Sequence, residues 1–71
     1  MTLIELANEI TLQGDIRISM WEDGEETKVK TYTMVDDLSC MNIPKWAKEK
    51  EVDFIFCCGD GYLHIEVKGG E

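Results

Sequence analysis

The chain has 71 residues, of which 15 are acidic and seven basic, so its formal net charge is -8. This length predicts one domain, spanning residues 1–71, with a small core, and a hydrophobic content of 44% is typical of a folded globular protein rather than a disordered one. The negative charge disfavours direct binding to nucleic acid or anionic lipid, and it favours a basic protein surface as the partner.

The first predicted element is a helix that begins after Thr2. The segment Thr2-Leu3-Ile4-Glu5 has the pattern of a capping box, in which Thr2 and Glu5 each bind the backbone N–H of the other. We expect the helix to end before Gly14, because glycine adopts a left-handed turn conformation at low cost. The apolar residues at helical spacing predict one buried stripe: Leu3, Leu6, Ala7 and Ile10.

Two strands are expected next. Residues Asp15 to Trp21 alternate between apolar and polar side chains, which is typical of a half-buried strand, and Thr27 to Val35 is rich in β-forming residues. Between them lies Glu22-Asp23-Gly24-Glu25, and Asp-Gly is a strong hairpin signal. The two strands should therefore pair antiparallel.

The second half of the chain predicts a short helix and another hairpin. Pro44 to Lys50 is compatible with a helix, and Val52 to Cys58 and Tyr62 to Lys68 are two β-like runs on either side of Gly59-Asp60-Gly61. In the first run, Val52, Phe54, Phe56 and Cys58 should share a face. We therefore predict an α+β fold, with an N-terminal helix packed on an antiparallel sheet of two β-hairpins and a short middle helix. A parallel pairing is disfavoured because no crossover helix of useful length is present.

Acidic residues gather at two places along the chain. One interpretation is solubility and turn chemistry; the other is a partner-binding surface on which carboxylates engage Lys and Arg and exposed aromatic residues act as anchors. The candidate partner-binding residues are Glu22, Asp23, Glu25 and Glu26 at the first hairpin tip, Asp36 and Asp37, and the aromatic residues Trp21 and Tyr32.

A different function is indicated by Asp53, Glu66 and Lys68. Asp53 lies near the start of one strand, and Glu66-Val67-Lys68 lies on the strand that follows it. This arrangement resembles the D…E-x-K signature of the PD-(D/E)xK nuclease superfamily. The resemblance implies two carboxylates that hold Mg²⁺ and a lysine that assists the attacking water. It covers about residues 53–70, and the alternative is an exposed strand face with solvated charges.

The cysteines and the histidine predict no metal centre. A zinc site from Cys40, Cys57, Cys58 and His64 is disfavoured, because zinc sites usually have ligands in pairs, whereas Cys57 and Cys58 should point to opposite faces of a strand. We also expect no cysteine–histidine contact, and hence no nucleophilic catalysis. The expectation is a protein without cofactors or metal ions, with reduced thiols.

The first third of the chain carries a second resemblance. The segments Leu3 to Ile10, Leu12 to Gly14 and Ile16 to Trp21 resemble the start of small uncharacterised proteins of phages and integrative elements of low-GC Gram-positive bacteria, a source that includes anti-CRISPR proteins. This implies a phage-encoded inhibitor that occupies a basic nucleic-acid-binding surface of a host defence protein.

The location and the oligomeric state are the last expectations. Met1 to Ile10 contains Glu5 and Glu9 where a secretory signal would be positively charged, so we expect the cytoplasm of a bacterial host cell. Three hypotheses remain open: a non-enzymatic acidic binding protein, a Mg²⁺-dependent nuclease or its remnant, and a homodimeric accessory or structural protein paired through Trp21 and Tyr32 or an unpaired sheet edge.

Overall fold

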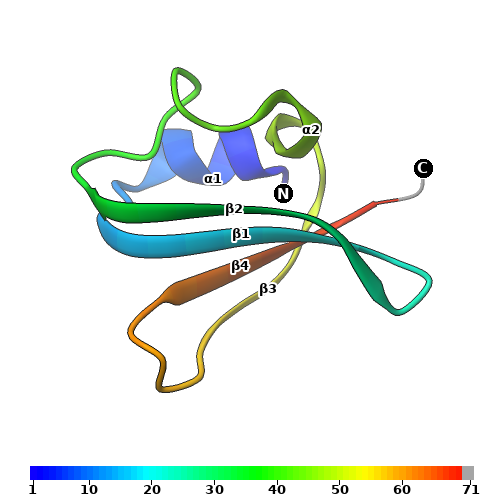
Figure 1. Ribbon diagram of the computed structural model, residues 1–71. Coiled ribbons are helices and arrows are strands. Elements are labelled where there is room, and N and C mark those ends of the chain that lie inside the picture. Colours follow the sequence, from blue (N-terminus) through cyan, green and yellow to red (C-terminus); the bar gives the residue numbers. More distant parts are fainter. Residues whose placement is uncertain (70–71) are drawn as a thin grey trace.

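The computed structural model describes residues 1–69, which form two helices, each followed in the chain by two strands (Figure 1). Helix α1 spans Leu3–Glu9 and helix α2 spans Lys45–Lys48. The strands are β1 (Gly14–Glu22), β2 (Glu25–Val35), β3 (Val52–Cys57) and β4 (Leu63–Lys68). Both helices lie on the same side of the sheet in Figure 1. The predicted α+β fold class is confirmed.

The four strands form one mixed sheet in the order β2-β1-β4-β3. Strands β1 and β2 pair antiparallel, as do β3 and β4, so both predicted hairpins are present. The two hairpins meet through β1 and β4, which run parallel, with Ile16 beside Leu63 and Trp21 beside Lys68. The expectation that every pairing is antiparallel is therefore wrong at this one contact.

The parallel pairing is possible because the segment between β2 and β3 forms part of the helical layer. This connection leaves one edge strand and reaches the other, and on the way it buries Leu38, Ile43 and Ala47. Its apolar residues, rather than a long crossover helix, supply the cover that a parallel pair requires. The sequence prediction considered only a long crossover helix, and for this reason it excluded the parallel pairing.

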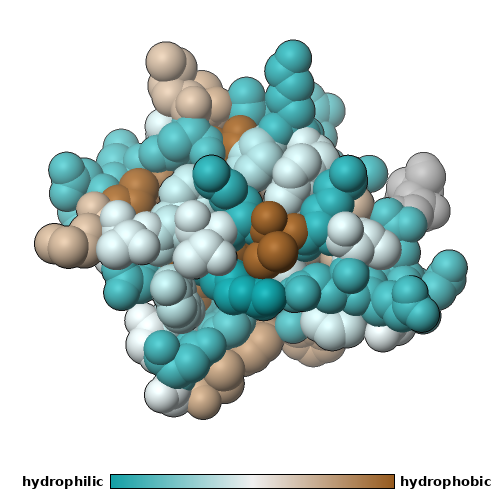
Figure 2. Space-filling view, viewed as in Figure 1, coloured by the Kyte–Doolittle hydropathy of each residue, from teal (hydrophilic) through white to brown (hydrophobic). Residues whose placement is uncertain are grey.

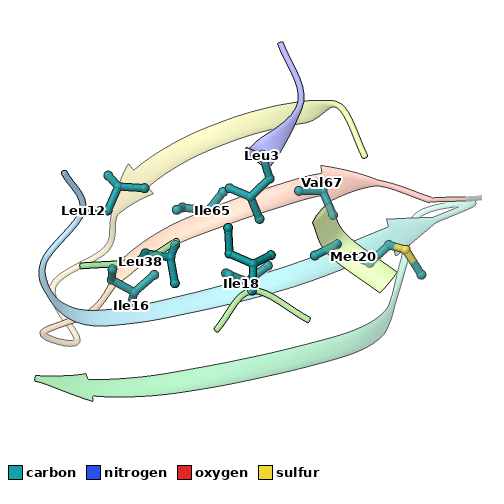
Figure 3. Close-up of a cluster of buried hydrophobic side chains, with 10 residues drawn as sticks. Leu3, Leu12, Ile16, Ile18, Met20, Leu38, Ile65 and Val67 are labelled. Carbon is teal, nitrogen blue, oxygen red and sulfur yellow. The ribbon is translucent and has the colours of Figure 1, made fainter. Parts of the chain in front are cut away.

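The core lies between the helical layer and one face of the sheet (Figure 3). Ile16, Ile18 and Met20 of β1 lie directly beside residues of β4 in the parallel register, and Ile18 faces Ile65. Leu3 of α1 closes this layer from above and is fully buried. Burial of these side chains is the main favourable contribution to folding.

Local sequence patterns fix the ends of two elements as expected. The Thr2 Oγ1 accepts from the Glu5 N–H, and the Glu5 carboxylate accepts from the Thr2 N–H at 2.8 Å, which is the predicted capping box. Asp23 and Gly24 both have positive φ, 53° and 79°, as a two-residue hairpin turn of type I′ requires. The predicted apolar stripe of α1 ends early, because Ile10 is the C-cap residue and is 52% exposed.

The face assignment of the third strand differs from the prediction at its first residue. The pairing of β3 with β4 shifts between Val52 and Phe54, which leaves Asp53 as an extra residue in a β-bulge. Val52 faces Val67 and packs against the core, whereas Phe54 faces Glu66 on the opposite side of the sheet. A single inserted residue reverses which side chains share a face, so alternation alone assigned Val52 to the wrong face.

Candidate functional site

The helices cover only one face of the sheet, and we call the opposite face the outer face. Its residues alternate with the core residues along every strand. Strand pairing places Ser19 between Val29 and Glu66, with Phe54 beyond Glu66. The remaining pairings add further residues to the outer face: Arg17, Trp21, Glu26, Thr31, Phe56, His64 and Lys68.

Two polar residues of the outer face are buried by their aromatic neighbours. Ser19 is 1% exposed and His64 is 7% exposed. The Trp21 Nε1–H donates to Ser19 Oγ at 3.2 Å, and Phe56 stacks on the His64 ring with centroids 5.0 Å apart. The aromatic rings therefore shield the polar groups below them, in a layer that is one side chain thick.

Strand β3 exposes apolar side chains on both faces. Phe54 and Phe56 belong to the outer face, and Ile55 lies opposite Ile65 on the helical side, beyond the cover of the helices. Their exposed fractions are 58%, 38% and 46% in that order. The outward backbone edge of β3 is paired only at its start, where the Val52 N–H donates to the Met1 carbonyl, at 2.9 Å. Within residues 1–69, no other segment pairs with that edge from 53 to 57.

The acidic hairpin tip between β1 and β2 lies at one end of the sheet (Figure 1), and Trp21 directly precedes it in the chain. Arg17 forms an ion pair with Glu26 at 3.0 Å, which compensates one of the four carboxylates. No ion pair in the described part of the chain involves Glu22, Asp23 or Glu25. On the side of the molecule that Figure 2 shows, hydrophobic residues lie in small separate groups among hydrophilic ones.

The structure does not bring all the predicted partner-binding residues together. Asp36 and Asp37 follow β2 at the end of the sheet opposite the hairpin tip. Tyr32 lies on the helical side, half-buried against the core, and its hydroxyl donates to the Asn42 carbonyl at 2.6 Å. Trp21 and the hairpin tip thus share one surface, from which Tyr32, Asp36 and Asp37 are separated.

The strand register places only two of the three candidate nuclease residues at regular positions on one face of the sheet. Glu66 and Lys68 lie on the same face of β4, as the spacing predicts. The residue beside Glu66 on β3 is Phe54, because Asp53 is the extra residue of the bulge. Lys68 lies beside Trp21 and borders a surface hollow with Glu49 and Glu51. This register gives the nuclease hypothesis no support.

One cluster was missed by the sequence analysis. Cys58 Sγ lies 3.3 Å from His64 Nε2, and Asp60 Oδ2 lies 2.8 Å from the same nitrogen. The expectation of no cysteine–histidine contact is therefore wrong. The information was present in the hairpin, because Phe56 faces His64 across the turn and Cys58 follows Phe56 by two residues, on the same face.

The carboxylate of this cluster is fixed by the turn. Asp60 Oδ1 accepts from the Tyr62 N–H at 3.0 Å. This hydrogen bond is the main reason why the pKa of Asp60 is lowered, and the contact with His64 is the next. Gly59 and Gly61, on either side of Asp60, have φ values of 88° and 90°, a region that non-glycine residues rarely adopt.

Comparison with known proteins finds no matching family model, and no match among curated proteins or among solved structures. Within the described residues, no helix is long and apolar enough to cross a membrane. Three surface features of this chain can carry a function: the exposed β3 edge, the acidic hairpin tip and the cluster at the second hairpin.

Proposed function

We propose that this chain is a non-enzymatic binding protein that takes up a basic segment of a partner protein along strand β3. The observation that carries the proposal is the run of three exposed apolar residues, Phe54 to Phe56, on an edge strand. Successive residues of a strand point to opposite faces, so apolar surface lies on both sides of one free backbone edge. An added strand can use the backbone edge for hydrogen bonds and the flanking side chains for specificity.

The two edges of the sheet differ in how they are protected. Exposed edges usually carry charged residues, especially lysine, which prevent pairing with another chain. The edge strand β2 has Lys28 and Lys30, both exposed, and its pairing with β1 is irregular at two places. Strand β3 has apolar residues at the corresponding central positions. This contrast supports β3 as the edge that accepts a partner.

Charge supports a basic partner over a second copy of the chain. Asp53 precedes Phe54, and Glu66 lies beside it on β4, so carboxylates border the apolar residue. Two copies, each with a net charge of -8, repel one another, whereas a segment rich in Lys or Arg is attracted. An apolar centre with a polar rim is the usual composition of a binding interface.

The proposal includes a role as an inhibitor. Protein surfaces that bind nucleic acid are basic, so a partner of this kind fits the charge of the chain. The chain would then compete with nucleic acid for that surface. The acidic hairpin tip beside Trp21 would increase the rate of association, as charge complementarity does in other complexes.

A defined probe can test the docking edge. Displayed random peptides are selected on the immobilised wild-type chain, and the expected sequences alternate apolar residues with Lys or Arg. The selected peptides are then measured against Phe54→Thr and against Val29→Thr, a matched control at an outer-face residue that is 46% exposed on the opposite edge strand. Phe54→Thr should weaken binding at least about 30-fold, as expected for an interface hot spot, and Val29→Thr should leave it unchanged.

Two results would contradict the proposal. One is equal peptide binding by Phe54→Thr and the wild type. The other is a stable dimer in sedimentation that Phe54→Thr converts to a monomer, which would assign the edge to self-association.

The role of the acidic tip needs its own control. Removal of three charges at the tip should slow association at low salt, whereas removal of three charges at the other end of the sheet should not. The tip variant is Glu22→Gln, Asp23→Asn and Glu25→Gln, and the control is Glu9→Gln, Asp36→Asn and Asp37→Asn. Equal slowing by both variants would show that only the total charge matters.

A further inference from the structure

We propose that Cys58, Asp60 and His64 form a binding site for Zn²⁺ at the turn between β3 and β4. The three side chains each contribute one donor atom, and these atoms lie within 4.8 Å of one another. They provide a sulfur, an oxygen and a nitrogen, the three kinds of ligand that zinc accepts in proteins. The site lies at the end of the sheet opposite the acidic hairpin tip, and it does not depend on the proposed partner.

The distances are close to those of a metal-bound arrangement. Zinc lies about 2.0–2.1 Å from a histidine nitrogen and about 2.3 Å from a cysteine sulfur. In a tetrahedral site, the nitrogen and sulfur are then about 3.5 Å apart, and the nitrogen and a carboxylate oxygen about 3.3 Å apart. The corresponding separations here are 3.3 Å and 2.8 Å. Both separations are slightly shorter than in a metal-bound site, so Cys58 and Asp60 would rotate away from His64 to admit the ion.

Two of the three ligands are already held in place. His64 is nine-tenths buried, lies in the interior strand β4 and is stacked on Phe56. Asp60 is fixed through its second oxygen by the Tyr62 N–H, at 3.0 Å. Supporting contacts of this kind orient metal ligands and raise the affinity of the site. Cys58 is exposed, and its Sγ is held only by the contact with His64, at 3.3 Å.

The geometry favours a metal ligand set over a catalytic triad. In a cysteine–histidine–aspartate triad, the nucleophile and the acid bind opposite nitrogens of the imidazole ring, so that the acid orients the ring while the other nitrogen takes the proton. Here Cys58 and Asp60 both contact Nε2 of His64. Because the thiol and the carboxylate both lie beside the same ring nitrogen, all three donor atoms can face one metal ion placed between them.

The donor set also selects the metal. Thiolate and imidazole suit Zn²⁺ and Co²⁺, whereas Mg²⁺ and Ca²⁺ prefer oxygen ligands alone. Three protein ligands leave a fourth position of the tetrahedron open. Because Cys58 and Asp60 are exposed, that position faces solvent, where water or a side chain of another molecule can fill it.

Cobalt provides a direct assay because a Co²⁺–thiolate bond has a near-ultraviolet charge-transfer band. We expect the wild type to bind one equivalent of Co²⁺ with this band, and Zn²⁺ to displace it. Cys58→Ser should remove the band and weaken metal binding by more than about 100-fold, since even outer-shell contacts contribute 10–100-fold. Asp60→Asn should weaken binding and keep the band. Cys57→Ser and Cys40→Ser are the matched controls, because neither thiol belongs to the cluster, and both should bind as the wild type does.

Exposed residues carry the test, since replacement of the buried His64 can unfold the chain. Far-ultraviolet circular dichroism verifies that Cys58→Ser and Asp60→Asn are folded. Binding should also release protons and weaken as the pH falls, because a thiol and an imidazole must lose protons to bind the ion. Three results would overturn the site: no saturable binding of Co²⁺, binding that Cys58→Ser leaves unchanged, or a band that Cys57→Ser abolishes.

Discussion

The exposure of β3 can be tested by one substitution made at two neighbouring positions. Ile65 and Ile55 face each other across the pairing of β4 and β3, on the helical side of the sheet. Ile65 is fully buried, whereas Ile55 is 46% exposed. We compare Ile65→Ala with Ile55→Ala, because the substitution, the strand pair and the face are the same, whereas Ile65 is buried on an interior strand and Ile55 is exposed on the edge strand.

The expected free energies follow from that difference. Truncation of a buried isoleucine to alanine costs about 2–5 kcal/mol, which includes the cavity left behind. Complete burial of such a side chain contributes about 1.5–3 kcal/mol. Ile55 is about half buried, so Ile55→Ala should lower the free energy of unfolding by about 1 kcal/mol. A domain of this size has a stability of about 4–10 kcal/mol. Ile65→Ala therefore removes at least about a fifth of the total and typically about half, and Ile55→Ala removes a small part.

Urea unfolding measures both values. With a slope of about 1 kcal/mol per molar urea for a small protein, Ile65→Ala should lower the midpoint by about 3 M and Ile55→Ala by about 1 M. In thermal unfolding, Ile65→Ala should lower the midpoint by roughly 12–24 °C. Equal losses for the two variants would mean that Ile55 is covered as well as Ile65, and the exposed edge on which the proposed function rests would not exist.

Three further predictions concern local structure. Tyr32→Phe should cost about 1 kcal/mol through loss of the hydrogen bond to Asn42. Burial raises the pKa of Tyr32 above its ordinary value of 10.0, so the stability that Tyr32 contributes should be present below pH 10.0 and be lost as the pH rises through the folded-state pKa. Tyr32→Phe should therefore reduce the loss of stability at alkaline pH, and the same loss in both proteins would refute this. The hydrogen bonds from Thr2 lower the pKa of Glu5 below its ordinary value of 4.5, so the stabilisation should be present above that pH and disappear as the pH falls. Urea curves of Glu5→Gln and wild type should then converge in acid, and a constant difference would argue against the capping box. Gly24→Ala should cost about 1 kcal/mol from backbone strain alone, because φ is 79° and no atom crowds the added carbon; a larger loss in urea unfolding would indicate a clash instead.

Features set by neighbouring residues could be predicted from the sequence. The capping box at Thr2 and Glu5 depends on a spacing of three residues, and the turn at Asp23-Gly24 depends on two residues with positive φ. In both cases the residues that decide the geometry are adjacent or one helical turn apart. Such patterns carry their own physical cause, and for this reason both predictions are confirmed.

Features that depend on distant residues could not be predicted in this way. The pairing of β1 with β4 is decided by which arrangement buries Ile18 against Ile65, and nothing near either residue specifies it. The bulge at Asp53 is a single-residue change of register, which hydrophobic alternation does not reveal. The candidate site was affected in the same way: the register places Phe54 beside Glu66, and it brings Cys58 to His64.

The parallel contact between the hairpins has a consequence for how the protein folds. Each hairpin can form by itself within microseconds, because its strands are joined by a tight turn. The core is complete only when β1 meets β4, and Ile16 and Leu63, which lie side by side there, are separated by more than half of the chain. Closing that loop costs entropy before any burial offsets it. Docking of two preformed hairpins, rather than formation of either one, should therefore set the folding rate.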